Sequence, residues 1–255
     1  MNRKLYQRVA TMFAVLVLTG ISLVAAQESS NDFGWFRGRP VEQNEPPKTE
    51  LIVARWRFNT NGAIGHMGWS HNYPESDRNL NVFLKRTTQI NVEPESYRIV
   101  DLGSDAVFDY PFAYISEPGE MLLNDQELTN LREFIHRGGF ILVDDFDGTW
   151  QLEQLRSQLR RAFPRQQLVT MAMDHLLFHA HFDLDSLEGM AEHVPGGTIA
   201  YIAMYDEQGR ATIVAGHNND LANFWEWYDT PSMPLKPSTD AFRLGSNAVI
   251  YAMTH

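Results

Sequence analysis

Short apolar runs alternate with amphipathic stretches along most of the chain. Residues 51–58 are continuously apolar in their front half, which is typical of a strand covered on both faces of a sheet. Leu80, Phe83 and Leu84 then recur at i, i+3 and i+4, so they predict a helix, which we expect Asp77 to cap. The same patterns predict further strands at 97–102, 111–116, 140–143, 198–205 and 212–215, and helices at 152–163 and 241–253.

One predicted helix has both of its ends marked in the sequence. Asn124 is a good N-cap, and Glu127 places negative charge in the first turn, where it suits the helix dipole. Gly138 and Gly139 end the helix, and a buried strand follows directly. Repetition of strand and helix predicts an α/β domain of three layers, in which a mostly parallel sheet carries helices on both faces.

The N-terminal residues have the pattern of an export signal. Three basic residues precede an apolar run of 16 residues, and small residues end that run at Ala26. Because a membrane span needs roughly 20 apolar residues, we expect cleavage after Ala26 rather than an uncleaved anchor. The expected organisation is therefore a signal peptide at 1–26, a disordered tether at 27–49 and a single domain at 50–255. We expect the protein to be periplasmic or secreted, with no membrane span after cleavage.

Charge and cysteine content exclude several classes of function. Without the three basic residues of the signal, 18 Lys and Arg stand against 32 Asp and Glu, which leaves a net charge of −14. Such an acidic chain does not suit a nucleic-acid partner, because phosphate binding needs clustered Lys and Arg. The chain has no Cys, so thiol nucleophiles and thiolate metal sites are also excluded.

Ligands of open parallel sheets bind beyond the carboxyl ends of the strands, and this rule selects the long loop at 59–76 first. The loop combines imidazoles and aromatic rings, which suit a sugar or another polar ring ligand. The alternative is a surface loop anchored on the core by Trp69. The candidate ligand-binding residues of this loop are His66, Trp69, His71 and Tyr73.

Asp144 and Asp145 follow the predicted strand at 140–143 directly. Adjacent residues of an extended chain point to opposite faces, so one carboxylate can face the ligand while the other caps the following helix. The functional interpretation is a general base or a metal carboxylate. The alternative is two carboxylates attracted to a helix start by its dipole.

Two later segments add candidates. The first segment gathers four residues of metal-ligating types within ten positions, His175, His179, His181 and Asp183. They are weak candidates for a metal site, and the alternative is a hydrogen-bonded turn with a buried His. We favour the turn, and we expect no metal or other cofactor. The segment 216–220 offers His217 and Asn218 at the end of a strand, followed by an aromatic run that is either a lid or packing. Motifs for nucleotide binding and for an α/β-hydrolase triad are missing.

Several stretches, taken in order, resemble a bacterial family known only as domain of unknown function 4159. They cover about residues 51–254, and they are Arg78-Asn79-Leu80, Asp109 to Ile115, Leu131 to Asp145, Asp174 to Phe178 and Arg243 to Asn247. The resemblance implies a class I glutamine-amidotransferase-like fold with flavodoxin-like layering. It also extends to trehalose-utilisation-type proteins, which are linked to carbohydrates.

The resemblance also implies where a site would lie. In the amidotransferase-like fold, a reactive Cys sits on a sharp turn after a strand that is preceded by Gly-Gly. The matching stretch here, residues 139–145, ends on Asp144 and Asp145, and the chain has no Cys. Glutaminase chemistry through a thioester is therefore excluded, whereas the shape of the site is expected to survive.

These observations leave enzyme and binding module both open. We expect a non-enzymatic ligand-binding or assembly module of the bacterial cell envelope, with a crevice lined by Asp144, His66 and His217. Its partner would be an envelope protein or a small polar ligand. The alternative is a hydrolase-like enzyme that acts on a carbohydrate or another polar small molecule. In that case Asp144 or Asp145 is the base, and His175 or His217 is the second proton carrier.

Overall fold

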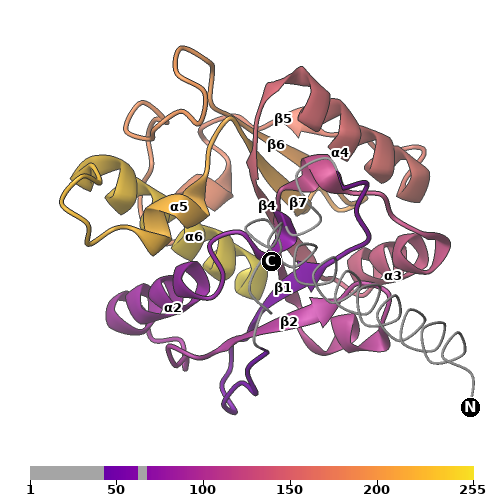
Figure 1. The fold of residues 1–255 in the computed structure, drawn as a ribbon, viewed down its shortest axis with the longest axis horizontal. Helices are drawn as coiled ribbons and strands as arrows, with labels where there is room; N and C mark the ends of the chain where they lie inside the picture. The colour runs from indigo at the N-terminus through magenta and orange to yellow at the C-terminus, as the bar shows by residue number, and fades with distance from the viewer. Residues whose placement is uncertain (1–42, 63–67) are drawn as a thin grey trace, which may run out of the picture. The chain divides into compact units, whose positions relative to one another are not determined.

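A seven-stranded mixed sheet runs through the part of the chain that the computed structural model describes, residues 43–62 and 68–255 (Figure 1). The expected signal peptide, most of the expected tether and the candidate His66 lie outside these described residues. The strands are β1 (Val53–Arg57), β2 (Tyr97–Asp101), β3 (Phe112–Ser116), β4 (Phe140–Phe146), β5 (Val169–Thr170), β6 (Ala200–Tyr205) and β7 (Ala211–His217).

The strand order is β2-β1-β3-β4-β7-β6-β5, which places β4 in the middle of the sheet. Strands β2, β1, β3, β4 and β7 run parallel, whereas β6 and the short β5 run antiparallel to their neighbours. The expected mostly parallel sheet is thus confirmed. The short strand β5 is not among the predicted elements.

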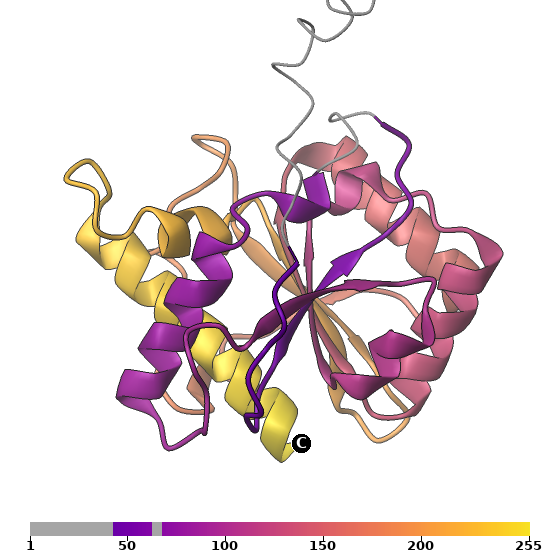
Figure 2. The ribbon, with the colours of Figure 1, turned by 60° about the horizontal axis from the view of Figure 1, so that its bottom comes forward.

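Helices cover both faces of this sheet, as the alternating pattern predicted. Helices α2, α5 and α6 pack together on one face, and α3 and α4 pack on the other (Figures 1 and 2). The helices are α2 (Glu75–Thr87), α3 (Asp125–His136), α4 (Gly148–Ala162), α5 (Leu221–Glu226) and α6 (Leu235–Thr254), with short 3-10 helices η1 (Gly68–Ser70), η2 (Asp105–Asp109), η3 (Pro118–Glu120) and η4 (Leu176–His179).

Local sequence explains the ends of α3. The Asn124 side chain accepts from the Glu127 backbone N–H, and the Glu127 carboxylate accepts from the Asn124 backbone N–H, so a reciprocal capping box is present. Gly138 follows the helix with φ +92°, a conformation that glycine adopts without strain. The predicted cap of α2 was wrong: Pro74 occupies the N-cap, and Asp77 is buried inside the helix, where it pairs with Arg55.

One part of the core lies where β3 and β4 meet α5 and α6. Tyr114, Phe140 and Leu142 on these strands are at most 1% exposed, as are Trp225 and Leu244 on the helices. Burying a side chain of this size stabilises a fold by roughly 1.5–3 kcal/mol. Because all seven residues of β4 are buried, its carboxyl end is held rigidly at the centre of the sheet.

The direction in which strands are added to the sheet reverses at β1. The chain passes from β1 to β2 on one side, and β3 then pairs with β1 on its other side. Ligand sites of open α/β sheets form at such switch points, beyond the carboxyl ends of the strands. The loop after β1 and the residue after β3 therefore meet at this edge.

Residues that precede β1 are attached to the domain. The Gln43 Nε2 donates to the Ile99 carbonyl at 2.9 Å, and the Asn44 Nδ2 donates to the Glu95 carbonyl at 2.8 Å, so residues of the expected tether contact the domain.

Among the helices of residues 43–62 and 68–255, none is long and apolar enough to cross a membrane.

Candidate functional site

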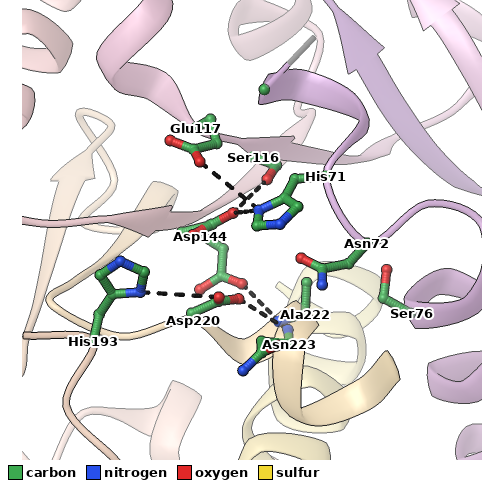
Figure 3. A network of polar contacts seen from close by, with 12 residues as sticks. His71, Asn72, Ser76, Ser116, Glu117, Asp144, His193, Asp220, Ala222 and Asn223 are labelled. Atoms are coloured by element: carbon green, nitrogen blue, oxygen red, sulfur yellow. Dashed lines mark hydrogen bonds and ion pairs between the residues drawn. The ribbon is translucent and has the colours of Figure 1, made fainter. Parts of the chain in front are cut away.

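Polar side chains from four strand ends converge at the carboxyl edge of the sheet (Figure 3). His71 comes from the loop after β1, and Ser116 and Glu117 lie at the end of β3. Asp145 lies near the end of β4, and Asp220 follows β7. The cluster thus occupies the place that the topology of the sheet favours for a ligand.

Asp145 and His71 form the closest contact of the cluster. The Asp145 Oδ2 lies 2.6 Å from the His71 Nδ1 and also accepts from the Ser116 hydroxyl at 3.2 Å. Asp145 is 2% exposed, whereas the His71 side chain is 52% exposed. A buried carboxylate therefore orients an imidazole that solvent, and hence a ligand, can reach.

Unusual backbone conformations concentrate around this pair. Within the described ranges, the non-glycine residues with positive φ are Asn72 (60°), Glu117 (53°), Asp145 (62°) and Asn218 (59°). Two of them are cluster members, and Asn72 directly follows His71 in the chain. At Asp145 the pairing of β4 with β7 shifts register between Val143 and Phe146, which turns the chain there. Such strained residues cluster at functional sites, because the surrounding structure must hold them in place.

Asp144 has a different task from its neighbour. Its carboxylate accepts from the Tyr114 hydroxyl at 2.6 Å and from the backbone N–H groups of Leu221 and Ala222 at 3.1 and 3.0 Å. The sequence had predicted that one carboxylate would face the crevice and the other cap the following helix. Asp144 does cap a helix start, but the helix is α5 rather than α4, which follows it in the chain.

Asp220 and His193 extend the cluster towards α4. Asp220 caps α5 by accepting from the Asn223 N–H at 2.9 Å, and its other oxygen lies 3.9 Å from the His193 Nδ1. The His193 Nε2 lies 3.2 Å from the Asp147 Oδ2. Asn218 holds the segment that carries His193, since its side-chain oxygen accepts from the Val194 N–H and its carbonyl from the His193 N–H.

Burial and mutual repulsion shift the titration of this cluster towards neutral pH. Burial raises the pKa of Asp144 to about 7, and burial together with neighbouring carboxylates raises the pKa values of Glu117 and Asp220 to about 8. The hydrogen bond to Asp145 raises the pKa of His71 to about 9. Groups that exchange protons near pH 7 are typical of acid–base catalysis.

Arg55 on β1 positions the loop that carries His71. Its Nη1 donates to the carbonyls of Trp69 and His71 at 3.2 and 2.9 Å, and its Nη2 lies 2.6 Å from the Asp77 carboxylate. The guanidinium also lies 4.5 Å from the centre of the Tyr114 ring. Burial opposes the charge of Arg55, but Asp77 and the tyrosines keep its pKa raised.

Two groups in the cluster have the donor atoms of a metal site. The ligand atoms of His71, Glu117 and Asp145 lie within 4.8 Å of one another, and so do those of Asp145, His193 and Asp220. In the described part of the chain, these carboxylates form ion pairs with His71 and His193. No Lys or Arg pair there offsets their negative charge.

The structure brings together only some of the residues that the sequence singled out. His71, Asp144 and Asp145 meet in the cluster. Asn218 is not a member, but it holds the segment that carries His193. Trp69 is 5% exposed, and Tyr73 is partly buried with its ring edge-on to Tyr97. His217 lies apart from the His71–Asp145 pair, with its Nε2 3.2 Å from the Gly148 carbonyl.

The His-rich segment lies elsewhere. The His175 ring contacts Tyr205 and Tyr251 at the opposite end of β7, and burial lowers its pKa. The His179 Nδ1 lies 3.1 Å from the Asp183 Oδ1, while the His181 Nε2 contacts the Thr87 carbonyl. These residues form no three-ligand group within residues 43–62 and 68–255.

Sequence reasoning assigned no role to Glu117, Asp147, His193 or Asp220. Glu117 directly follows a predicted strand, so the rule that selects carboxyl ends could have found it. Asp220 belongs to a segment that the same rule did select. His193 lies 48 residues beyond Asp145 in an irregular segment, and no local pattern marks it.

Residues 56–253 match the family described as Domain of unknown function (DUF4159). The chain belongs to this family. The matched range contains every member of the cluster, from His71 to Asp220, so the cluster is part of the family domain itself. No curated protein matches the chain.

Proposed function

We propose that the cluster is the active site of a hydrolytic enzyme that acts on an uncharged polar substrate, such as a carbohydrate. The convergence of His71 on Asp145 carries this proposal, because the two residues lie 74 positions apart and meet at 2.6 Å, with Asp145 held in the left-handed region at φ 62°. A module that only packs or assembles has no need for this geometry. The enzymatic alternative is therefore preferred to the non-enzymatic module expected from the sequence.

Hydrolysis needs a group that accepts the proton of the attacking water and a group that donates a proton to the leaving oxygen. Glu117 and Asp220 have pKa values of about 8 and His71 of about 9, so at pH 7 these groups are mostly protonated and can donate, whereas Asp144, with a pKa of about 7, is partly ionised and can accept. The water oxygen bonds to the electrophilic carbon, and the water proton passes to an ionised carboxylate of the cluster. The bond from that carbon to the leaving oxygen breaks, and this oxygen takes a proton from a group that is still protonated. His71 is the member that reaches the substrate, because Asp145 holds Nδ1 and the ring is half exposed.

Charge and an exposed aromatic ring favour a neutral polar substrate. The carboxylates of the cluster repel anions, so a charged phosphate or carboxylate substrate is disfavoured. Trp150, in the first turn of α4 and three residues after Asp147, is 57% exposed. We propose that Trp150 stacks on the substrate ring, because Trp69, the candidate ligand-binding tryptophan of the loop, is buried.

We also propose that the fold is the glutamine-amidotransferase-like arrangement without its Cys. The position of Asp145 supports this, since φ is +62° on a turn at the carboxyl end of the central strand β4. A sharp turn of this kind is where that fold presents its nucleophile. The export signal that the sequence predicts at 1–26 supports the further proposal that the enzyme works in the periplasm or outside the cell.

A panel of chromogenic substrates tests the proposed activity. Purified full-length chain is incubated with nitrophenyl glycosides and nitrophenyl esters of neutral acids. The variants Asp145→Asn and His71→Gln are measured beside His136→Gln, a control at an exposed His of α3. We expect turnover of at least one glycoside, a roughly 10²–10⁴-fold loss in the first two variants, and wild-type rates in the control.

Asn is chosen at position 145 because it tolerates the left-handed conformation. A folded wild-type chain that turns over no member of the panel would overturn the enzymatic proposal in favour of the binding module. Equal losses in all three variants would overturn the assignment of the site.

A further inference from the structure

We propose that Asp145 is a shared ligand of two divalent transition-metal ions. His71 and Glu117 complete the first position, and His193 and Asp220 complete the second. The inference rests on the proposed function, because the ions would activate water at the same cluster. Beyond that function, it assigns a metal cofactor to the cluster and makes Asp145 the ligand that the two metal positions have in common.

Distances within each group fit an ion with small movements. The His71 Nδ1 lies 2.6 Å from an Asp145 oxygen and 3.8 Å from the Glu117 Oε1, while the His193 Nδ1 lies 3.9 Å from the Asp220 Oδ2. Ligand atoms about 2.1 Å from one ion lie roughly 3–3.5 Å apart in tetrahedral geometry. Because the ligand atoms of each group lie within 4.8 Å of one another, each group needs shifts of at most about 1–2 Å to close on an ion.

Neighbouring groups already orient these ligands as in known metal sites. The His193 Nε2 contacts the Asp147 carboxylate at 3.2 Å, which leaves Nδ1 directed at Asp220. A carboxylate that holds the second nitrogen of a ligating His is a common feature of metal centres. The Ser116 hydroxyl donates to Asp145 at 3.2 Å and restrains that carboxylate in the same way.

An independent observation comes from Asn72. This residue is 8% exposed, and its Oδ1 is buried and has no hydrogen-bond partner. Its Nδ2 donates to the Glu226 carboxylate, which fixes the orientation of the amide. Figure 3 shows the oxygen turned towards His71 and Asp144. A buried acceptor without a protein donor is free to accept a further hydrogen bond, and a water bound to a metal ion would supply the donor.

Charge and donor chemistry select the kind of ion. Five carboxylates gather here, from Glu117, Asp144, Asp145, Asp147 and Asp220, and two divalent ions would bring four positive charges. Imidazole nitrogen together with carboxylate oxygen suits Zn²⁺, Mn²⁺ and Fe²⁺, whereas Ca²⁺ and Mg²⁺ prefer oxygen alone.

Two ions that share Asp145 would explain the chemistry of the proposed hydrolysis. Paired ions about 3.5–4 Å apart stabilise both the attacking and the leaving oxygen. A first ion held by His71 and Asp145 would displace the proton between them, since metal binding releases protons from its ligands.

Manganese binding to the full-length chain tests the proposal. The chain is first freed of metal with a chelator, and Mn²⁺ is then titrated by calorimetry. Paramagnetic resonance reports whether the bound ions are magnetically coupled neighbours. We expect two coupled ions per wild-type chain and per His136→Gln chain. His71→Gln and His193→Gln should each retain one uncoupled ion, and Asp145→Asn should weaken both positions at least about tenfold.

Several outcomes would overturn the proposal: no bound Mn²⁺, a single ion lost equally in both His variants, or unchanged binding in Asp145→Asn. Urea unfolding of each variant confirms that it is folded before binding is measured. Turnover that persists in chelator, with no ion bound, overturns this inference and leaves the proposed function intact. Two bound ions without turnover of any substrate overturn the proposed function instead.

Discussion

Replacing Arg55 separates the contribution of a buried ion pair to stability from its contribution to the site. Arg55 is 1% exposed and Asp77 2% exposed, and the same guanidinium donates to the loop carbonyls of Trp69 and His71. The variant Arg55→Met leaves Asp77 charged, buried and without its partner. The double variant Arg55→Met/Asp77→Leu removes both charges but also leaves the two carbonyls without their donor.

Magnitudes follow from the burial of the pair. Removing one partner of a buried ion pair costs about 3–5 kcal/mol, because the remaining charge is uncompensated. Replacing both partners by apolar side chains is often neutral or stabilising by about 1–4 kcal/mol. Each carbonyl that loses its donor costs about 1–3 kcal/mol if it stays buried. We therefore expect Arg55→Met to lose about 5 kcal/mol or more, and the double variant to recover roughly 3–5 kcal/mol of that loss, the part caused by the uncompensated charge.

Urea unfolding and turnover are measured on the same samples. Although the double variant regains stability, its kcat/KM should remain at least about tenfold below wild type, because His71 is no longer held against Asp145. The control is Arg57→Met on the same strand. Arg57 pairs with Asp101, and their side chains are 45% and 51% exposed, so this loss should cost at most about 1 kcal/mol. Wild-type turnover in the double variant would refute the positioning role of Arg55.

Three further predictions concern strain, pH and substrate contact. Because φ is +62° at position 145, Asp145→Ala should be about 1 kcal/mol less stable than Asp145→Gly in urea unfolding, the reverse of the usual order. In chelator, the folded-state pKa values of Glu117 and Asp220 (about 8) and His71 (about 9) all exceed their unfolded values. The folded state thus holds protons that the unfolded chain has released, so stability is greatest below about pH 4 for these carboxyls and declines as pH rises to 9. We expect a loss of at least about 2 kcal/mol between pH 5 and 9, and a rising urea midpoint would contradict this. Trp150→Ala should raise KM for a glycoside roughly tenfold with little change in kcat or stability, and a fall in kcat alone would contradict the stacking role.

Local interactions account for what the sequence predicted well. The capping box of Asn124 and Glu127 and the left-handed Gly138 involve residues only a few positions apart, so propensity and pattern reveal them. The strand at β4 is evident from its apolar run, and its central place makes Asp144 and Asp145 reasonable candidates. Asp77 shows the limit, since its residue type suits a cap but Arg55 on a neighbouring element determines its place.

The sequence by itself determined the α/β class, most of the elements, the absence of thiol chemistry and the importance of the carboxylates after β4. Tertiary structure alone decided which side chains meet those carboxylates. His71 and Asp145 are 74 positions apart. Glu117 and Asp220 join them because β1, β3, β4 and β7 lie parallel and end at one edge, and His193 joins them because it precedes β6, which runs antiparallel to β7. Strand order depends on packing between elements distant in the chain, so no local pattern in the sequence encodes it. The left-handed turn at Asp145 arises in the same way, from a register shift against β7, and no glycine marks it beforehand.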